Sequence, residues 1–169
     1  MKKLLSALIL LLLTTTAFAN ILTLTSSAFD DREKLNSIYT CDGKNISPPL
    51  AWQNIPKNTV SFALIISDPD APSGTFYHWV IYNLPKTTTS LVENITTLPT
   101  GTKVAKNTWD NQQYKGPCPP KGTQHRYVFT LYALDTMLNL ADDANAQTVL
   151  DAIQNHIVGV AELKAMYAH

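Results

Sequence analysis

Four side chains that can exchange protons or bind ligands stand beside two proline-rich stretches of the sequence. Asp68 and Asp70 belong to the first stretch, Asp68-Pro-Asp-Ala-Pro72, and His78 follows it. His125 follows the second stretch, Gly116-Pro-Cys-Pro-Pro120. Carboxylates and imidazoles act as general acids and bases, and both bind metals. Each also has an ordinary structural role, since Asp-Pro-Asp forms turns. The four predict a site only if the fold brings them together.

The segments that carry these residues alternate between apolar and polar side chains, which predicts strands. A period of two runs through residues 60–67, 77–84, 125–134 and 157–167. We expect the following sets to share a face: Val60, Phe62, Leu64 and Ile66; His78, Val80, Tyr82 and Leu84, with Tyr77, Trp79 and Ile81 opposite; His125, Tyr127, Phe129, Leu131 and Ala133; and Ile157, Ala161, Leu163 and Tyr167.

Residues 143–155 are the one convincing helix, because apolar residues recur there at helical spacing. Four strands with one late helix, joined by proline-rich and glycine-rich loops, predict an antiparallel β-sandwich. Such folds place function in the loops at strand ends, where a rigid scaffold holds exposed groups.

Composition limits the class of protein. The chain has 169 residues, of which 45% are hydrophobic and 15% are charged, which suits one domain with a sizeable core. Its 13 basic and 13 acidic residues argue against a nucleic-acid partner, which calls for a basic surface.

The first nineteen residues predict a cleaved signal peptide. Two lysines precede the apolar run 4–13, and Ala17-Phe18-Ala19 is a pattern that signal peptidase accepts. The run is too short for a transmembrane helix, although an uncleaved N-terminal anchor is the alternative. We therefore expect a mature domain over 20–169, periplasmic or secreted by a bacterium, with no transmembrane segment.

The expected compartment determines the expected oxidation state of the two cysteines. In an oxidising space Cys41 and Cys118 are expected to form a structural disulfide. A reactive Cys118 thiol is the competing interpretation.

Several motifs together resemble the phosphatidylethanolamine-binding protein family, and more closely its bacterial Raf kinase inhibitor-like branch. They are Tyr39-Thr-Cys-Asp-Gly43, Asp68-Pro-Asp-Ala-Pro72, Tyr77-His78-Trp79, Gly116-Pro-Cys-Pro-Pro120 and His125-Arg-Tyr127. The resemblance extends over 20–169 and implies a β-sandwich with a C-terminal helix.

The resemblance also implies a pocket for phosphate or a similar anion, such as a phospholipid head group. Carried over to this sequence, the ligand-binding residues would be Asp68, Asp70, His78, Pro119, Pro120, His125 and Tyr127. The implied protein is a non-catalytic binding or regulatory protein without a cofactor, with a small anionic ligand and an enzyme partner that it inhibits.

Two aspartates would repel a phosphate unless their charge is used elsewhere. An aspartate that accepts an imidazole N–H would orient that ring and raise its pKa, so that His78 and His125 present N–H donors beside the Tyr127 hydroxyl. We expect Asp70 to have this role and leave the role of Asp68 open, since its side chain could simply brace the turn; the alternative is an aspartate that meets an ethanolamine ammonium. Arg126 is expected to be structural.

Three alternatives remain open at this point. A hydrolase could use a metal held by the two aspartates and two histidines, or a nucleophilic Cys118 with His125 as base. A purely structural role is the third. An outward face with Tyr77 and Trp79 would suit a homodimer.

Overall fold

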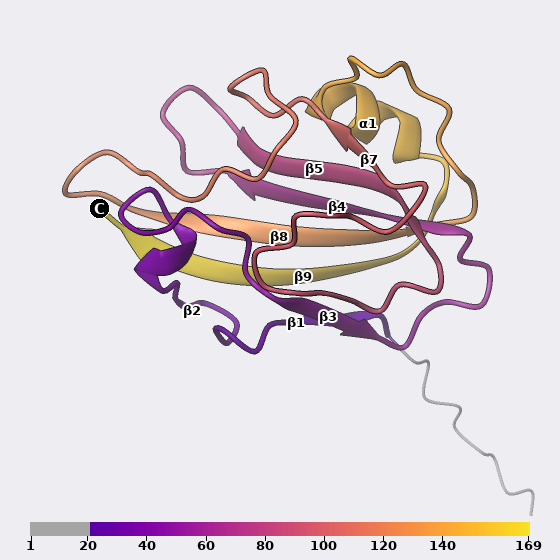
Figure 1. Ribbon diagram of the computed structural model, residues 1–169, viewed down its shortest axis with the longest axis horizontal. Helices are drawn as coiled ribbons and strands as arrows, with labels where there is room; N and C mark the ends of the chain where they lie inside the picture. Colours follow the sequence, from indigo (N-terminus) through magenta and orange to yellow (C-terminus); the bar gives the residue numbers. More distant parts are fainter. Residues whose placement is uncertain (1–20) are drawn as a thin grey trace, which may run out of the picture.

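The computed structural model describes residues 21–169 as two β-sheets packed face to face with one helix outside them (Figure 1). The predicted signal peptide, residues 1–19, lies outside the described residues. Within the described part of the chain, no helix has the length and apolar character needed to cross a membrane.

The larger sheet has six strands in the order β2-β9-β8-β4-β5-β7. Their bounds are β2 Glu33–Lys34, β9 Ile157–Ala168, β8 Gln124–Leu134, β4 Ser61–Asp68, β5 Phe76–Pro85 and β7 Lys103–Ala105. The smaller sheet has the order β1-β3-β6, with β1 Thr23–Thr25, β3 Leu50–Gln53 and β6 Ser90–Leu91. The four predicted strands are thus present as β4, β5, β8 and β9. All pairings are antiparallel except the short parallel pair β2–β9, which is a minor departure from the expected antiparallel sandwich.

Strand β4 is buried on both faces because it lies at the centre of the larger sheet. Phe62, Leu64 and Ile66 face the core between the sheets. Ala63 and Ile65 face a second apolar cluster that includes Val149 of the helix. The second cluster explains why β4 reads as a nearly continuous apolar run rather than a strict alternation.

Helix α1 spans Ala146–Ile153 and covers the outer face of the larger sheet (Figure 1). Its first turn is capped by Asn145, whose side chain accepts a hydrogen bond from the Thr148 N–H at 3.0 Å. The helix is shorter than the predicted 143–155, because the cap fixes its start at Asn145. A single 3₁₀ turn, Ser37–Tyr39, is the other helical element described.

Some expected faces are wrong, and the cause is irregular pairing between β4 and β5. Asn83 has φ 58° and exchanges two hydrogen bonds with the Leu138 backbone. The register shifts at this point, so Leu84 joins Ile81 in the core between the sheets instead of sharing a face with Val80. Such a bulge reverses the side-chain parity.

Two strand ends and one aromatic also differ from expectation. Val60 precedes β4 and Ile157 opens β9, so both lie at the rim of the sheet and are 42% and 38% exposed. Trp79 is only 4% exposed and packs in the core. Trp79 therefore does not supply the outward hydrophobic face that the homodimer prediction invoked.

Candidate functional site

A cavity of about 270 Å³ opens where β4, β5 and β8 meet two loops. Its walls come from three strands, from the turn after β4 and from the loop before β8. The lining residues are Asp68, Ala71, Pro72, Ser73, Phe76, His78, Trp109, Cys118, Pro119, Pro120, His125 and Tyr127. Six of the seven predicted ligand-binding residues are in this list, and the exception is Asp70.

Asp68 ends β4 and His125 begins β8, which pairs with β4. The His125 Nδ1–H donates to Asp68 Oδ2 at 2.7 Å, and both side chains are less than one tenth exposed. The other carboxylate oxygen accepts the Asp70 N–H at 2.9 Å. Asp68 therefore orients the imidazole and closes the turn at the same time.

Asp70 points away from the cavity and forms a bidentate pair with Arg126. The guanidinium donates to both carboxylate oxygens at 2.8–3.2 Å, and the Arg126 backbone N–H adds a bond of 2.9 Å. These hydrogen bonds hold the pKa of Asp70 below its usual value. The expected role of Asp70 is therefore wrong, because Asp70 forms the structural pair with Arg126. Asp68, whose role was left open, binds the histidine.

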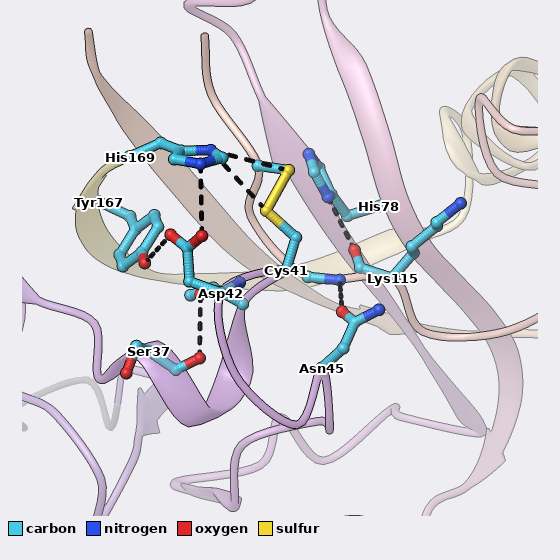
Figure 2. Close-up of a disulfide and its surroundings, with 11 residues drawn as sticks. Ser37, Cys41, Asp42, Asn45, His78, Lys115, Tyr167 and His169 are labelled. Atoms are coloured by element: carbon cyan, nitrogen blue, oxygen red, sulfur yellow. Dashed lines mark hydrogen bonds and ion pairs between the residues drawn. A yellow bond between two sulfur atoms is a disulfide. The ribbon is translucent and has the colours of Figure 1, made fainter. Parts of the chain in front are cut away.

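His78 is held by a backbone carbonyl rather than by a carboxylate. Its Nδ1–H donates to the Lys115 carbonyl at 2.7 Å, and the side chain is buried in β5 (Figure 2). Burial lowers the pKa of His78, although the Lys115 carbonyl and the Asp68 charge act in the opposite direction. The prediction of a raised pKa is wrong for this histidine. His78 is neutral near pH 7, so its Nε2 carries a lone pair rather than a proton.

Two aromatic side chains beside His78, Phe76 and Trp109, form an aromatic wall that was not predicted from the sequence. Trp109 lies edge-on to His78 with ring centroids 5.1 Å apart, and Phe76 lies 4.5 Å from Trp109. The Lys115 ammonium sits over the Trp109 ring at 4.6 Å, a favourable cation–π distance. A lone tryptophan within a polar loop was the available sequence signal.

Asn107 fixes the loop that carries Trp109. Its side chain accepts the Trp109 N–H at 3.0 Å and donates to the His78 carbonyl at 3.3 Å. It also donates to the Gln113 carbonyl at 3.0 Å, and it is only 5% exposed. One buried amide thus ties the aromatic wall to the strand that carries the histidine.

Tyr127 lies on β8 and completes the wall between the two histidines. Its ring centroid is 5.3 Å from that of His78, and its buried hydroxyl makes no hydrogen bond of normal geometry within residues 21–169. Burial, the Asp68 charge and the approach of the hydroxyl to the Asp68 carboxylate raise the pKa of Tyr127. The phenol therefore stays protonated beside Asp68.

Cys41 and Cys118 form the predicted disulfide, with Cα atoms 5.4 Å apart (Figure 2). The bridge lies at the cavity rim, because Cys118, Pro119 and Pro120 all belong to the wall. It leaves Cys118 without a thiol, so the Cys118–His125 nucleophile pair is wrong for this form of the protein.

The predicted metal site of two aspartates and two histidines also differs from the structure. Asp70 faces Arg126, and the His78 Nδ1–H is bound to a carbonyl. Among residues 21–169, the group of histidine, cysteine and acidic side chains close enough to share a metal ion is Cys41, Cys118 and His169. This group contains none of the four residues Asp68, Asp70, His78 and His125.

The chemistry available in the cavity is that of hydrogen bonding to a small polar ligand. It offers two imidazoles and a phenol against one carboxylate, which is already bound to His125. Most of the remaining wall is apolar, with three prolines and the aromatic rings of Phe76 and Trp109, and polar contacts are stronger beside such surface than in water.

Comparisons with known proteins agree with this architecture. The family described as Phosphatidylethanolamine-binding protein matches residues 25–168. A protein from Methanothermobacter thermautotrophicus, named UPF0098 protein, is 48% identical over 147 residues, which is 85% of this chain and 97% of the relative. A UPF0098 protein from Aquifex aeolicus is 40% identical and covers 84% of this chain and 85% of its own.

Two solved structures have the same fold. A putative phosphatidylethanolamine-binding protein homologue from Chlamydia trachomatis matches with a TM-score of 0.83 at 35% identity, over 89% of this chain and 99% of its own. YbcL of E. coli, described as a member of the mammalian family, matches with a TM-score of 0.83 at 31% identity, over 88% of this chain and 98% of its own. The sandwich, the motifs and these matches together show that the chain belongs to the phosphatidylethanolamine-binding protein family.

Proposed function

We propose that the protein is a non-catalytic binding protein that captures a small oxyanion, such as phosphate or the phosphate of a head group, in the cavity beside Asp68. The observation that carries the proposal is that two buried imidazoles on different strands, His78 and His125, line one cavity. Burying a polar group costs free energy unless it has a hydrogen-bond partner, and a ligand in the cavity would be such a partner for both imidazoles.

The charged groups of the cavity are compatible with an anion, because the one carboxylate in its wall, Asp68, is already hydrogen-bonded to His125. Asp68 Oδ2 accepts the His125 Nδ1–H at 2.7 Å and Oδ1 accepts the Asp70 N–H at 2.9 Å, so both carboxylate oxygens already have a donor. Burial lowers the pKa of His78, which favours the neutral imidazole. An oxyanion is recognised there either by its own O–H, donated to the His78 Nε2, or by proton uptake on His78 as it binds. The second route gives a charge-assisted hydrogen bond.

The size and wall of the cavity favour a small ligand. A volume of about 270 Å³ lies just below the range of about 300–1,000 Å³ that holds drug-sized molecules. Phe76 and Trp109 present aromatic surface to the same space, which suits the ethanolamine or choline end of a head group. Phosphate and phosphoethanolamine are therefore the natural probes.

The compartment and the partner belong to the same proposal. A disulfide at the cavity rim persists in oxidising spaces, which supports the periplasm or the exterior of the cell as the working location. A rigid rim of Cys118, Pro119 and Pro120 around a small cavity also suits contact with a protein, so we propose an enzyme partner that the protein inhibits.

Isothermal titration calorimetry of residues 20–169 with phosphate and with phosphoethanolamine tests the proposal. His78→Gln and His125→Gln should each weaken binding at least about tenfold, the value of one lost charge-assisted hydrogen bond. His156→Gln is the matched control, because His156 is an exposed histidine paired with Asp135 at 2.8 Å and lies outside the cavity wall. Unchanged affinity in both cavity variants, with folding verified by circular dichroism, would contradict the anion site.

A further inference from the structure

Three groups that bind soft metals meet at the surface beside the cavity. The Sγ atoms of Cys41 and Cys118 and the Nδ1 atom of His169 all lie within 4.8 Å of one another. The imidazole nitrogen is 4.0 Å from each sulfur and so faces the bridge symmetrically (Figure 2). All three residues are exposed, so both a reductant and a metal ion can reach them.

The other side of the His169 ring is held by a carboxylate. Its Nε2 lies 3.3 Å from Asp42 Oδ1, and Asp42 Oδ2 accepts the Tyr167 hydroxyl at 2.5 Å (Figure 2). Carboxylate–histidine pairs orient metal-binding imidazoles in this way. In the tautomer with the proton on Nε2, beside the Asp42 carboxylate, the Nδ1 lone pair of His169 faces the two sulfurs.

The three residues are held near one another by bonds other than the disulfide. The Cys41 N–H donates to the Pro117 carbonyl at 3.0 Å, which joins the two cysteine loops. The Gly122 N–H donates to the His169 carbonyl at 3.2 Å, which fixes the end of β9 to the loop after Cys118. Neither hydrogen bond involves a sulfur atom, so neither depends directly on the sulfur–sulfur bond.

We propose that reduction of the Cys41–Cys118 bridge converts this cluster into a zinc site with two thiolates and the His169 imidazole as ligands. A dithiol protein of the same compartment supplies the two electrons by thiol–disulfide exchange: the Cys41–Cys118 disulfide becomes two thiols while the dithiol becomes a disulfide. Zinc then binds both sulfurs and releases their two protons. The oxidised protein holds no thiolate, so metal binding and the bridge exclude one another. The inference does not depend on what the cavity binds.

The nitrogen–sulfur distances need only a small adjustment, whereas the two bonded sulfurs must move apart after reduction, by rotation of the cysteine side chains. Tetrahedral zinc with its usual bond lengths separates two sulfurs by about 3.8 Å and a sulfur from a nitrogen by about 3.6 Å. The observed nitrogen–sulfur distances of 4.0 Å are within about half an ångström of that value. Three protein ligands leave the fourth position for water or another small ligand, as in zinc sites that remain open.

Cobalt is the direct probe, because thiolate ligation gives a sulfur-to-cobalt charge-transfer band and tetrahedral geometry gives intense visible bands. Residues 20–169 are reduced with a dithiol, desalted under nitrogen and titrated with Co²⁺, and zinc is then added. We expect one cobalt per reduced chain, with the charge-transfer band lost when zinc displaces it. The oxidised protein should show no such band.

Variants identify the ligands. His169→Gln should weaken cobalt binding at least about tenfold and change the visible bands, and Asp42→Asn should weaken it by about 10–100-fold, the usual effect of such a partner. His156→Gln is the control, since His156 has its own carboxylate partner, Asp135, but belongs to no cluster of potential metal ligands. It should bind cobalt like the parent.

A reduced, folded protein without a charge-transfer band would overturn the proposal, and so would a His169→Gln variant with the parent affinity and spectrum. Should circular dichroism show that reduction alone unfolds the protein, refolding on addition of zinc supports the site. Failure of zinc to restore the fold rejects it.

Discussion

Replacing Asp68 by asparagine tests the central pair of the site most directly. Asp68 Oδ2 accepts the His125 Nδ1–H at 2.7 Å in a position where both side chains are less than one tenth exposed. The substitution keeps an oxygen for the Asp70 N–H, which donates to Oδ1 at 2.9 Å. It replaces only the acceptor that faces the imidazole, so the loss reports on the buried pair rather than on the turn.

The expected cost follows from that contact. A hydrogen bond to a charged partner contributes about 1.5–3 kcal/mol, and removing one member of a buried pair leaves its partner without an acceptor. We expect the free energy of unfolding to fall by about 2–3 kcal/mol. For a domain of this size, about 2–4 °C are lost per kcal/mol, so the melting temperature should fall by about 4–12 °C.

Asp70→Asn is the matched control within the same motif. Asp70 also pairs with a cation, but its side chain is 31% exposed and that of Arg126 is 52% exposed. Solvent screens such a pair, so this variant should lose much less stability than Asp68→Asn. The measurement is urea denaturation followed by circular dichroism at pH 7. Equal losses in the two variants, or a larger loss at Asp70, would refute the assignment of Asp68 as the buried partner of the histidine.

Three further predictions concern the remaining parts of the site. Burial lowers the pKa of His78 and a bound phosphate raises it, so binding should take up a proton, and affinity should fall as pH rises through the pKa of the bound state. Calorimetry in two buffers of different ionisation enthalpy measures this; zero proton uptake would exclude the proton-uptake route and leave the ligand's own O–H as the donor to His78. Tyr127→Phe removes a buried hydroxyl without a partner, so the free energy of unfolding should stay constant or rise by about 1 kcal/mol while phosphate binding weakens; a clear loss of stability would show that the hydroxyl is bonded. Replacing both Cys41 and Cys118 by alanine opens a bridge between residues 77 apart, which in the chain-entropy model costs about 4.5 kcal/mol; a loss below about 1 kcal/mol in urea denaturation would be inconsistent with that effect.

The long strands could be predicted from the sequence because their periodicity reflects burial. On β8, the alternate residues His125, Tyr127 and Phe129 are all buried, as expected. Strands of two to four residues, such as β1, β2 and β7, are too short to show a period. The bulge at Asn83 could not be predicted either, because a single asparagine with positive φ does not change the apolar pattern of the sequence.

The site could be predicted in part for a similar reason. The motifs identified the loops that meet at the cavity, but they did not show which of two neighbouring aspartates turns inward. That choice depends on the strand opposite: His125 and Arg126 project to opposite faces of β8, so Asp68 meets the buried one and Asp70 the exposed one. Trp109 was missed because its position is set by Asn107, through contacts that the sequence does not display.

The position of β9 has a consequence for how the chain reaches its final state. This strand comes last in sequence, yet it lies between β2, near the start of the described chain, and β8. Pairings between such distant segments slow folding, because the ends must meet before either is stabilised. The sheet therefore cannot close until β9 has emerged from the ribosome. During that interval the unpaired edges of β2 and β8 are targets for chaperones and for aggregation, so removing β9 should produce insoluble protein rather than a smaller stable domain.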